Sequence, residues 1–282
     1  MTSFCYNADD IYKWAEFSGD FNPIHFDNAR AANLNLPNVL VHGMRVMLDI
    51  KSAMFHRAVQ PNGTTWIDTT DWLLYKATLR SPVLLGKSYI LNIDEKRTGY
   101  HYTLTDEQSL DECITGYIRL IPSPNSAPNT HEDLESAWRL FTIIPEELTA
   151  SISAFLACSQ SHRDPWLLLD ALLFRIAMKE ESLFTHMSQS LQAFSIRSTE
   201  ELMQKSTVLQ THHSTLISNK VQKLRVRADG RVGDLDKIDC IIESPITDGN
   251  PMDGFVVQTT LAAYDEEGLL LRTTVGLKIF VE

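Results

Sequence analysis

A long apolar segment at residues 39–55 constrains the fold of this chain more than any other feature. It contains no proline, has one glycine near its start, and is apolar on nearly all sides, which is typical of a buried helix. Stretches rich in β-branched and aromatic residues follow it, separated by turn residues. They predict strands at residues 64–68, 73–79, 88–95, 100–106 and 112–121. A buried helix followed by antiparallel strands predicts a sheet that wraps around the helix.

The second half of the 282-residue chain repeats this order of elements. Residues 122–130 are rich in proline, serine and asparagine, which indicates a linker. After it, helices are predicted at residues 146–159 and 164–178, the second of them apolar with Pro165 in its first turn. Further strands are predicted at residues 192–197, 207–217, 220–227, 237–243, 254–264 and 269–281. We therefore expect two similar halves, residues 1–121 and 138–282, joined by a linker at residues 122–137.

Upstream of the buried helix, residues 17–26 place an acid and an imidazole in a bent loop. A glycine frees the backbone before Asp20, and Pro23 removes an amide donor and biases Asn22 toward an extended conformation. Such a loop can direct the Asp20 carboxylate and the His25 imidazole at one point, as general acid–base catalysis requires. The alternative for an isolated Asp or His is structural: the segment is a turn with a helix cap, and hydrogen bonds satisfy His25.

The pattern S-G-D-x-N-P-I-H, followed after a short spacer by V-H-G-M, closely resembles the signature of MaoC-like, (R)-specific enoyl-thioester hydratases and dehydratases. The resemblance covers about residues 11–48. It continues weakly through residues 76–87, where Lys87 replaces an acid that the family usually has. It implies a hot-dog fold, in which an antiparallel sheet wraps around a central helix. With two halves in one chain, we expect an α+β double hot-dog.

The resemblance also implies an active site built mostly by the first half, with Asp20 and His25 holding one water between them. In hydration this water adds across the 2,3 double bond of an enoyl thioester. In dehydration His25 takes the proton next to the carbonyl while protonated Asp20 helps the hydroxyl leave, although the sequence leaves this division of roles open. The amide of Gly43, at the start of the buried helix, is expected to donate to the thioester oxygen. Asn22 and His42 are candidate substrate-binding residues, and bracing the turn or the helix start is an equally good role for each.

The second half lacks the acid–histidine pattern, and its simplest predicted role is to complete the sheet and shape the acyl tunnel. However, P-W-L-L-L-D-A-L-L at residues 165–173 resembles the dehydratase domains of polyketide synthases, which place a catalytic Asp opposite a His from the first half. Asp170 occupies that position, although Phe174 stands where those domains usually have Gln or His. A polyketide-type dehydratase using His25 with Asp170 is therefore one alternative. A non-catalytic acyl-thioester-binding protein and a thioesterase are others, since the fold alone does not determine the chemistry.

Composition limits the class of protein further. With 44% apolar and 22% charged residues, the chain is typical of a soluble globular protein, and no apolar run reaches membrane-spanning length. The start of the sequence lacks the features of a signal peptide, and four scattered cysteines indicate reduced thiols in the cytoplasm. The net charge of −11 argues against a nucleic-acid partner.

The predicted partner is an acyl-CoA or acyl-carrier-protein thioester, with no cofactor and no metal. Two adjacent histidines, His212 and His213, are predicted to lie on a strand, where they point to opposite faces and form a poor metal site. Because the fused halves already supply a pair of hot dogs, both a monomer and a homodimer are consistent with the sequence.

Overall fold

The computed structural model describes residues 2–59, 72–123, 137–159, 164–181, 183, 186–187, 198–224, 232, 235, 237–250 and 252–281. The helices are α1 (Ala8–Ser18), the 3-10 helix η1 (Pro23–His25), α2 (Asn28–Asn33), α3 (Gly43–Val59), α5 (Pro145–Cys158), α6 (Pro165–Lys179), α8 (Thr199–Lys205) and α9 (Asn219–Lys223). The strands are β1 (Thr2–Cys5), β2 (Trp72–Leu79), β3 (Ser88–Lys96), β4 (Gly99–Asp106), β5 (Glu112–Ile121), β6 (Arg139–Ile143), β7 (Ser206–Ile217), β8 (Ile238–Ile242), β9 (Ile246–Asn250), β10 (Gly254–Asp265) and β11 (Gly268–Val281).

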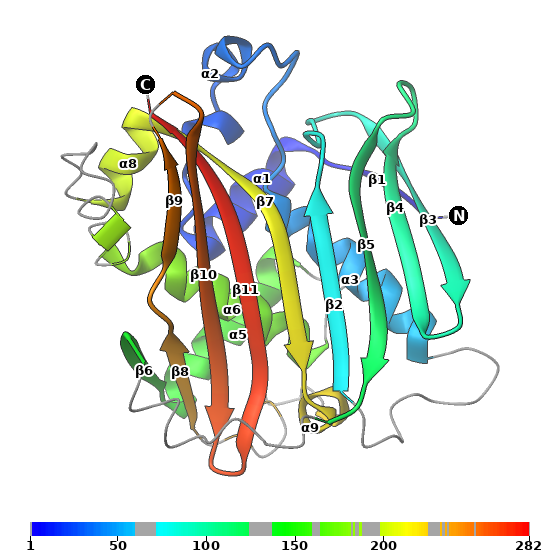
Figure 1. Cartoon of the computed structure of the whole chain (residues 1–282), viewed down its shortest axis with the longest axis vertical. Coiled ribbons are helices and arrows are strands. Elements are labelled where there is room, and N and C mark those ends of the chain that lie inside the picture. Colours follow the sequence, from blue (N-terminus) through cyan, green and yellow to red (C-terminus); the bar gives the residue numbers. More distant parts are fainter. Residues whose placement is uncertain are drawn as a thin grey trace.

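An 11-stranded antiparallel sheet forms one layer of the molecule, and helices α1, α3, α5 and α6 lie against one of its faces (Figure 1). The strand order is β1-β3-β4-β5-β2-β7-β11-β10-β8-β6, with β9 paired to β10. Read inward from each edge, the two halves have the same topology, because β6, β8, β10, β11 and β7 take the places of β1, β3, β4, β5 and β2. The halves join where β2 pairs with β7, from Leu73 opposite Ile217 to Thr78 opposite His212.

Each half has a central helix packed on its own strands. Helix α3 contacts β4 and β5, helix α6 contacts β10 and β11, and the two helices contact each other. Large side chains of both helices, such as Met47 and Trp166, are fully buried in the main hydrophobic core. The repeated topology and the paired central helices confirm the predicted double hot-dog fold.

Several predicted boundaries differ from the structure. Helix α3 begins at Gly43 instead of residue 39, because the preceding residues are extended and Val41 donates to the carbonyl of Val83. The strand predicted at residues 220–227 is wrong where the structure describes it: Ser218 caps the short helix α9 there by accepting from the amide of Val221. Strands β1, β6 and β9 were not predicted. The predicted strands at 64–68 and 192–197 lie outside the described residues, as does most of the linker, and the division into two domains stays a prediction. None of the described helices is long and apolar enough to cross a membrane.

Helix α1, which leads into the acid–histidine loop, has a strong N-terminal cap. The Asn7 side chain accepts from the amides of Asp9 and Asp10, and the Asp10 carboxylate accepts from the amide of Asn7 in return. We expect Asn7→Ala to lower the free energy of unfolding by about 1 kcal/mol, since an N-cap side chain satisfies amides that the helix leaves unpaired. Urea denaturation measures this loss. The exposed Asn92→Ala serves as control, and an equal effect of the two substitutions would contradict the capping role.

Candidate active site

The loop between α1 and η1 is fixed at both ends. Helix α1 ends at Gly19, which has a left-handed backbone conformation (φ +82°) and donates to the carbonyl of Ala15. The next turn is held by Asn22, whose Oδ1 accepts from the amide of Ile24 (3.3 Å) and whose Nδ2 donates to the carbonyl of Val208 on β7 (3.1 Å). Asn22 therefore braces the loop against a strand of the second half, so the loop is positioned by both halves of the chain.

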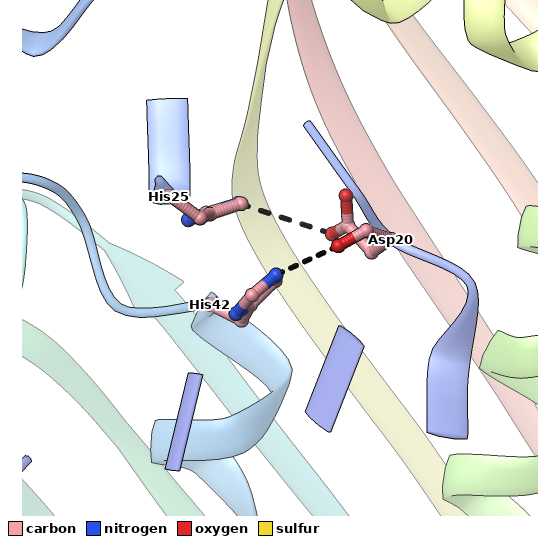
Figure 2. A group of neighbouring side chains, drawn as sticks. All are labelled: Asp20, His25 and His42. Atoms are coloured by element: carbon pink, nitrogen blue, oxygen red, sulfur yellow. Dashed lines mark hydrogen bonds and ion pairs between the residues drawn. The ribbon is translucent and has the colours of Figure 1, made fainter. Parts of the chain in front are cut away.

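Asp20 and His25 face each other from the two sides of this loop (Figure 2). Nδ1 of His25 lies 2.9 Å from the carbonyl oxygen of Leu40. Because a carbonyl can only accept, this nitrogen carries the hydrogen in the neutral ring, and the lone pair lies on Nε2. Nε2 is 3.9 Å from Oδ2 of Asp20, which is too far for a direct hydrogen bond. At this separation the two groups can instead both contact one bound oxygen that lies beside them.

His42 completes the cluster from the turn just before α3. Its Nε2 donates to the main-chain oxygen of Asp20 (2.9 Å), and its ring stacks on that of His25 with centroids 3.7 Å apart (Figure 2). Nδ1 of His42 is buried and has no hydrogen-bond partner among the described residues. The structure thus places His42 both beside the loop that it braces and in the lining of the cavity described below.

Burial shifts the titration of all three groups toward their neutral forms. Desolvation raises the pKa of the Asp20 carboxyl, although His25 and the amide of Asn22 oppose this shift. Desolvation also lowers the pKa of His25, opposed by the Asp20 carboxylate and by the hydrogen bond to Leu40. The pKa of His42 is held well below its usual value by burial and by its neighbour His25. The shifts of Asp20 and His25 both favour the forms that acid–base catalysis on one substrate requires, a neutral imidazole as base and a protonated carboxyl as acid.

A cavity of about 470 Å³ adjoins this cluster, and both polar and apolar side chains line it. Asp20, His25 and Gly43 are among the lining residues. Gly43 is the first residue of α3, so its amide has no partner within the helix, and the helix dipole favours negative charge there. The apolar walls come from both halves of the chain and include Leu36, Met44, Phe174, Met178, Met203 and Leu277.

Asp170, which was predicted as a substrate-binding residue or as the partner of His25, is not among the residues that line this cavity. It is completely buried in α6, where Oδ2 pairs with the ammonium of Lys51 on α3. Oδ1 accepts from His213 (3.1 Å) and from Thr215 (3.1 Å). Burial alone would raise the pKa of Asp170, but Lys51 and then His213 hold it well below its usual value. These contacts favour the ionised carboxylate, whereas a general acid must hold a proton.

Asp20, His25 and His42 are also the described residues that could together hold a metal ion, since one ligand atom of each lies within 4.8 Å of the others. The stacked rings of His25 and His42 oppose this use. A ring nitrogen binds a metal in the plane of its ring, and two nearly parallel stacked rings cannot both direct a lone pair at one point. The donor set fits a proton-transfer site better than a metal site.

Sequence reasoning missed the residues that the second half contributes to this site. Val208 anchors Asn22, and Gln210 on β7 lies in the cavity lining next to Gly43. Neither residue belongs to a recognisable motif. Only the pairing of β7 with β2 brings them to the first half's loop.

Comparisons with known proteins support the resemblance to MaoC-like proteins that the loop sequence indicates. Residues 2–99 match the family model described as MaoC like domain. The mitochondrial 3-hydroxyacyl-[acyl-carrier-protein] dehydratase of Arabidopsis thaliana is 36% identical over 81 residues, which are 29% of this chain and 43% of that protein. The chain therefore matches less than half the length of this curated relative. The predicted similarity to MaoC-like proteins is confirmed for residues 2–99.

Solved structures resemble the chain over most of its length at low sequence identity. One described as a MaoC-like dehydratase is 10% identical, with a TM-score of 0.46 and coverage of 97% of this chain and 94% of its own. The dehydratase domain of PpsC from Mycobacterium tuberculosis, in complex with C12:1-CoA, is 10% identical, with a TM-score of 0.43 and coverage of 87% and 86%.

Proposed function

We propose that this chain is a hydro-lyase that interconverts 3-hydroxyacyl and trans-2-enoyl thioesters of coenzyme A or an acyl carrier protein. The observation that carries the proposal is the pair Asp20 and His25 in the lining of the cavity. His25 Nε2 and the Asp20 carboxyl are 3.9 Å apart, so one oxygen of the substrate or of water that lies beside the pair can be within hydrogen-bond distance of both. The match of residues 2–99 to the MaoC like domain supports the same reaction.

In dehydration, Nε2 of His25 takes a proton from C2 of the 3-hydroxyacyl group, and the electrons of that bond form the double bond between C2 and C3. The bond between C3 and oxygen breaks, and the protonated Asp20 carboxyl supplies the proton that makes the leaving group water. The amide of Gly43 donates to the thioester oxygen, where negative charge develops as the C2 proton leaves. Hydration runs through the same steps in reverse.

The apolar part of the cavity lining suits the acyl chain. Because both halves contribute to the lining, we assign a different role to each half. In this proposal residues 1–121 carry the chemistry, and residues 138–282 close the wall of the acyl site through side chains such as Phe174 and Met178. The name of the Arabidopsis relative supports an acyl-carrier-protein thioester as one substrate. An acyl-CoA thioester is the other proposed substrate.

The purified chain, incubated with crotonyl-CoA, tests the proposed reaction against its rivals. A hydratase removes the ultraviolet absorbance of the enoyl thioester without releasing a free thiol, which a thiol reagent detects separately. Equal loss of absorbance and release of thiol would indicate a thioesterase. Binding of crotonyl-CoA and of a crotonyl carrier protein without turnover of either would contradict the proposed activity and favour a binding protein.

The titration of His25 provides a further prediction. We expect its pKa in the wild type to lie below 6.5, because burial disfavours the charged ring. In Asp20→Asn it should fall further, since the carboxylate that favours the imidazolium is gone. Two-dimensional NMR of the imidazole resonances measures both values, and the exposed Asp111→Asn serves as control. A pKa above 6.5, or one that rises in Asp20→Asn, would contradict the described environment.

A further inference from the structure

A bulge in β7 brings two polar side chains of the second half to the same face of the sheet. In the pairing with β11, His212 lies opposite Gly276 and Gln210 opposite Leu277, so Thr211 is an extra residue on β7. In a regular strand Gln210 and His213 would point to opposite faces. Here Nε2 of Gln210 lies 3.3 Å from Nδ1 of His213. Bulges next to active sites commonly redirect a side chain in this way.

Gln210 reaches across the junction between the halves to the start of α3. A methyl group placed on Gly43 would lie only 2.9 Å from Oε1 of Gln210, so this oxygen sits against the glycine backbone. Both residues line the cavity. Among the described residues, Oε1 takes part in no hydrogen bond, and Gln210 is only half-buried. It therefore presents an acceptor to the cavity at the point where the thioester group is proposed to bind.

A buried chain of polar groups fixes the orientation of this amide. The carboxylate of Asp170 accepts from Nε2 of His213, which leaves the lone pair of the neutral ring on Nδ1. Burial and the charge of Lys51 lower the pKa of His213, which keeps the ring neutral. A lone pair on Nδ1 requires a donor, so the NH₂ of Gln210 must face His213 and its Oε1 must face Gly43. Lys51, Asp170 and His213 thus act as positioning residues for Gln210.

We propose that Gln210 contacts the substrate, with Oε1 accepting from the amide N–H that follows the thioester sulfur in the phosphopantetheine arm. Oε1 can only accept, and Gly43 already supplies the donor for the thioester oxygen. The nearest donor on the carrier side of the thioester is this amide, which coenzyme A and acyl carrier proteins share. The inference rests on the proposed function and adds to it a contact that would distinguish pantetheine thioesters from simple ones.

The test compares two crotonyl thioesters that differ in this amide. The N-acetylcysteamine thioester retains the amide, and the S-ethyl thioester lacks it. Because a neutral hydrogen bond contributes about 0.5–1.5 kcal/mol, Gln210→Met should lower the ratio of kcat/KM for the first thioester to that for the second by about two- to thirteenfold. The same ratio should stay at the wild-type value in Gln204→Met, which makes the same chemical change at an exposed glutamine outside the cavity lining.

A double-mutant cycle tests the positioning role of His213. His213→Ala alone should lower the same ratio, and adding Gln210→Met to it should lower the ratio no further. An unchanged ratio in Gln210→Met would overturn the inference while leaving the hydratase proposal intact. If the wild type turns over neither thioester, the ratio of their dissociation constants decides the role of Gln210 by the same criterion, and crotonyl-CoA decides the hydratase proposal. If the wild type binds neither thioester, the proposed contact of Gln210 and the positioning role of His213 are both overturned.

Discussion

Replacing His25 by alanine should lower kcat for the hydration of crotonyl-CoA by about a thousandfold, within the 10²–10⁴ that a positioned acid or base contributes. The lone pair of Nε2 lies 3.9 Å from the Asp20 carboxylate, and the hydrogen bond from Nδ1 to Leu40 fixes the tautomer of the ring. Asp20→Asn should have an effect of similar size, because an amide cannot supply the proton. The double variant should lose little more than either single one, since the two groups act as a unit.

Matched controls separate this effect from general damage. His101→Ala removes an exposed imidazole from β4, and Asp111→Asn neutralises an exposed carboxylate. Neither side chain lines the cavity, so both variants should keep wild-type kcat. Circular dichroism and melting temperature check that the Asp20 and His25 variants are folded. Folded variants that retain more than a tenth of wild-type kcat would contradict the assignment of this pair.

Asp170→Asn should lower the free energy of unfolding by about 3–5 kcal/mol, since it leaves a buried Lys51 ammonium without its counter-charge. Both side chains are completely inaccessible to solvent, so water cannot replace the lost partner. Lys51→Met should lower the free energy of unfolding by less than Asp170→Asn does. Lys51 lowers the pKa of His213, so its removal allows His213 to take a proton and pair with Asp170. In Lys51→Met the pKa of His213 is higher than in the wild type, and protonated His213 stabilises the variant only at low pH. The difference in free energy of unfolding between the wild type and Lys51→Met should therefore grow as the pH rises through the pKa of His213 in the variant.

Urea denaturation of the variants measures these differences. The double variant Lys51→Met with Asp170→Leu should recover part of the stability lost in Asp170→Asn, because it removes both buried charges together. Asp111→Asn again serves as the exposed control. A loss below 1 kcal/mol in Asp170→Asn would contradict the buried ion pair.

The fold could be predicted from the sequence because its main determinants are local. Residues 39–55 are apolar on nearly all sides, and the strands of both halves carry alternating or β-rich patterns with turn residues between them. The short edge strands β1 and β6 were missed, since four or five mostly exposed residues show no clear pattern and are held mainly by their pairing with β3 and β8.

The site could be predicted only in part. Asp20, His25 and Gly43 belong to one continuous motif, and they line one cavity in the structure. Asp170 also belongs to a recognisable pattern, but the lysine that neutralises it lies 119 residues away on another helix, which no local pattern reveals. Gln210 depends on a bulge in β7 and on strand pairing between the halves. Contacts set by tertiary structure override what a short motif implies.

The most direct test of the central claim is mass spectrometry of crotonyl-CoA after incubation with the wild type and with the Asp20→Asn/His25→Ala double variant. A hydro-lyase that uses this pair converts the thioester into a product heavier by one water, and the folded double variant produces it no faster than buffer alone. The same product formed at the same rate by the double variant would place the chemistry elsewhere. No product from the wild type, on this thioester or on its carrier-protein counterpart, would contradict the proposed activity.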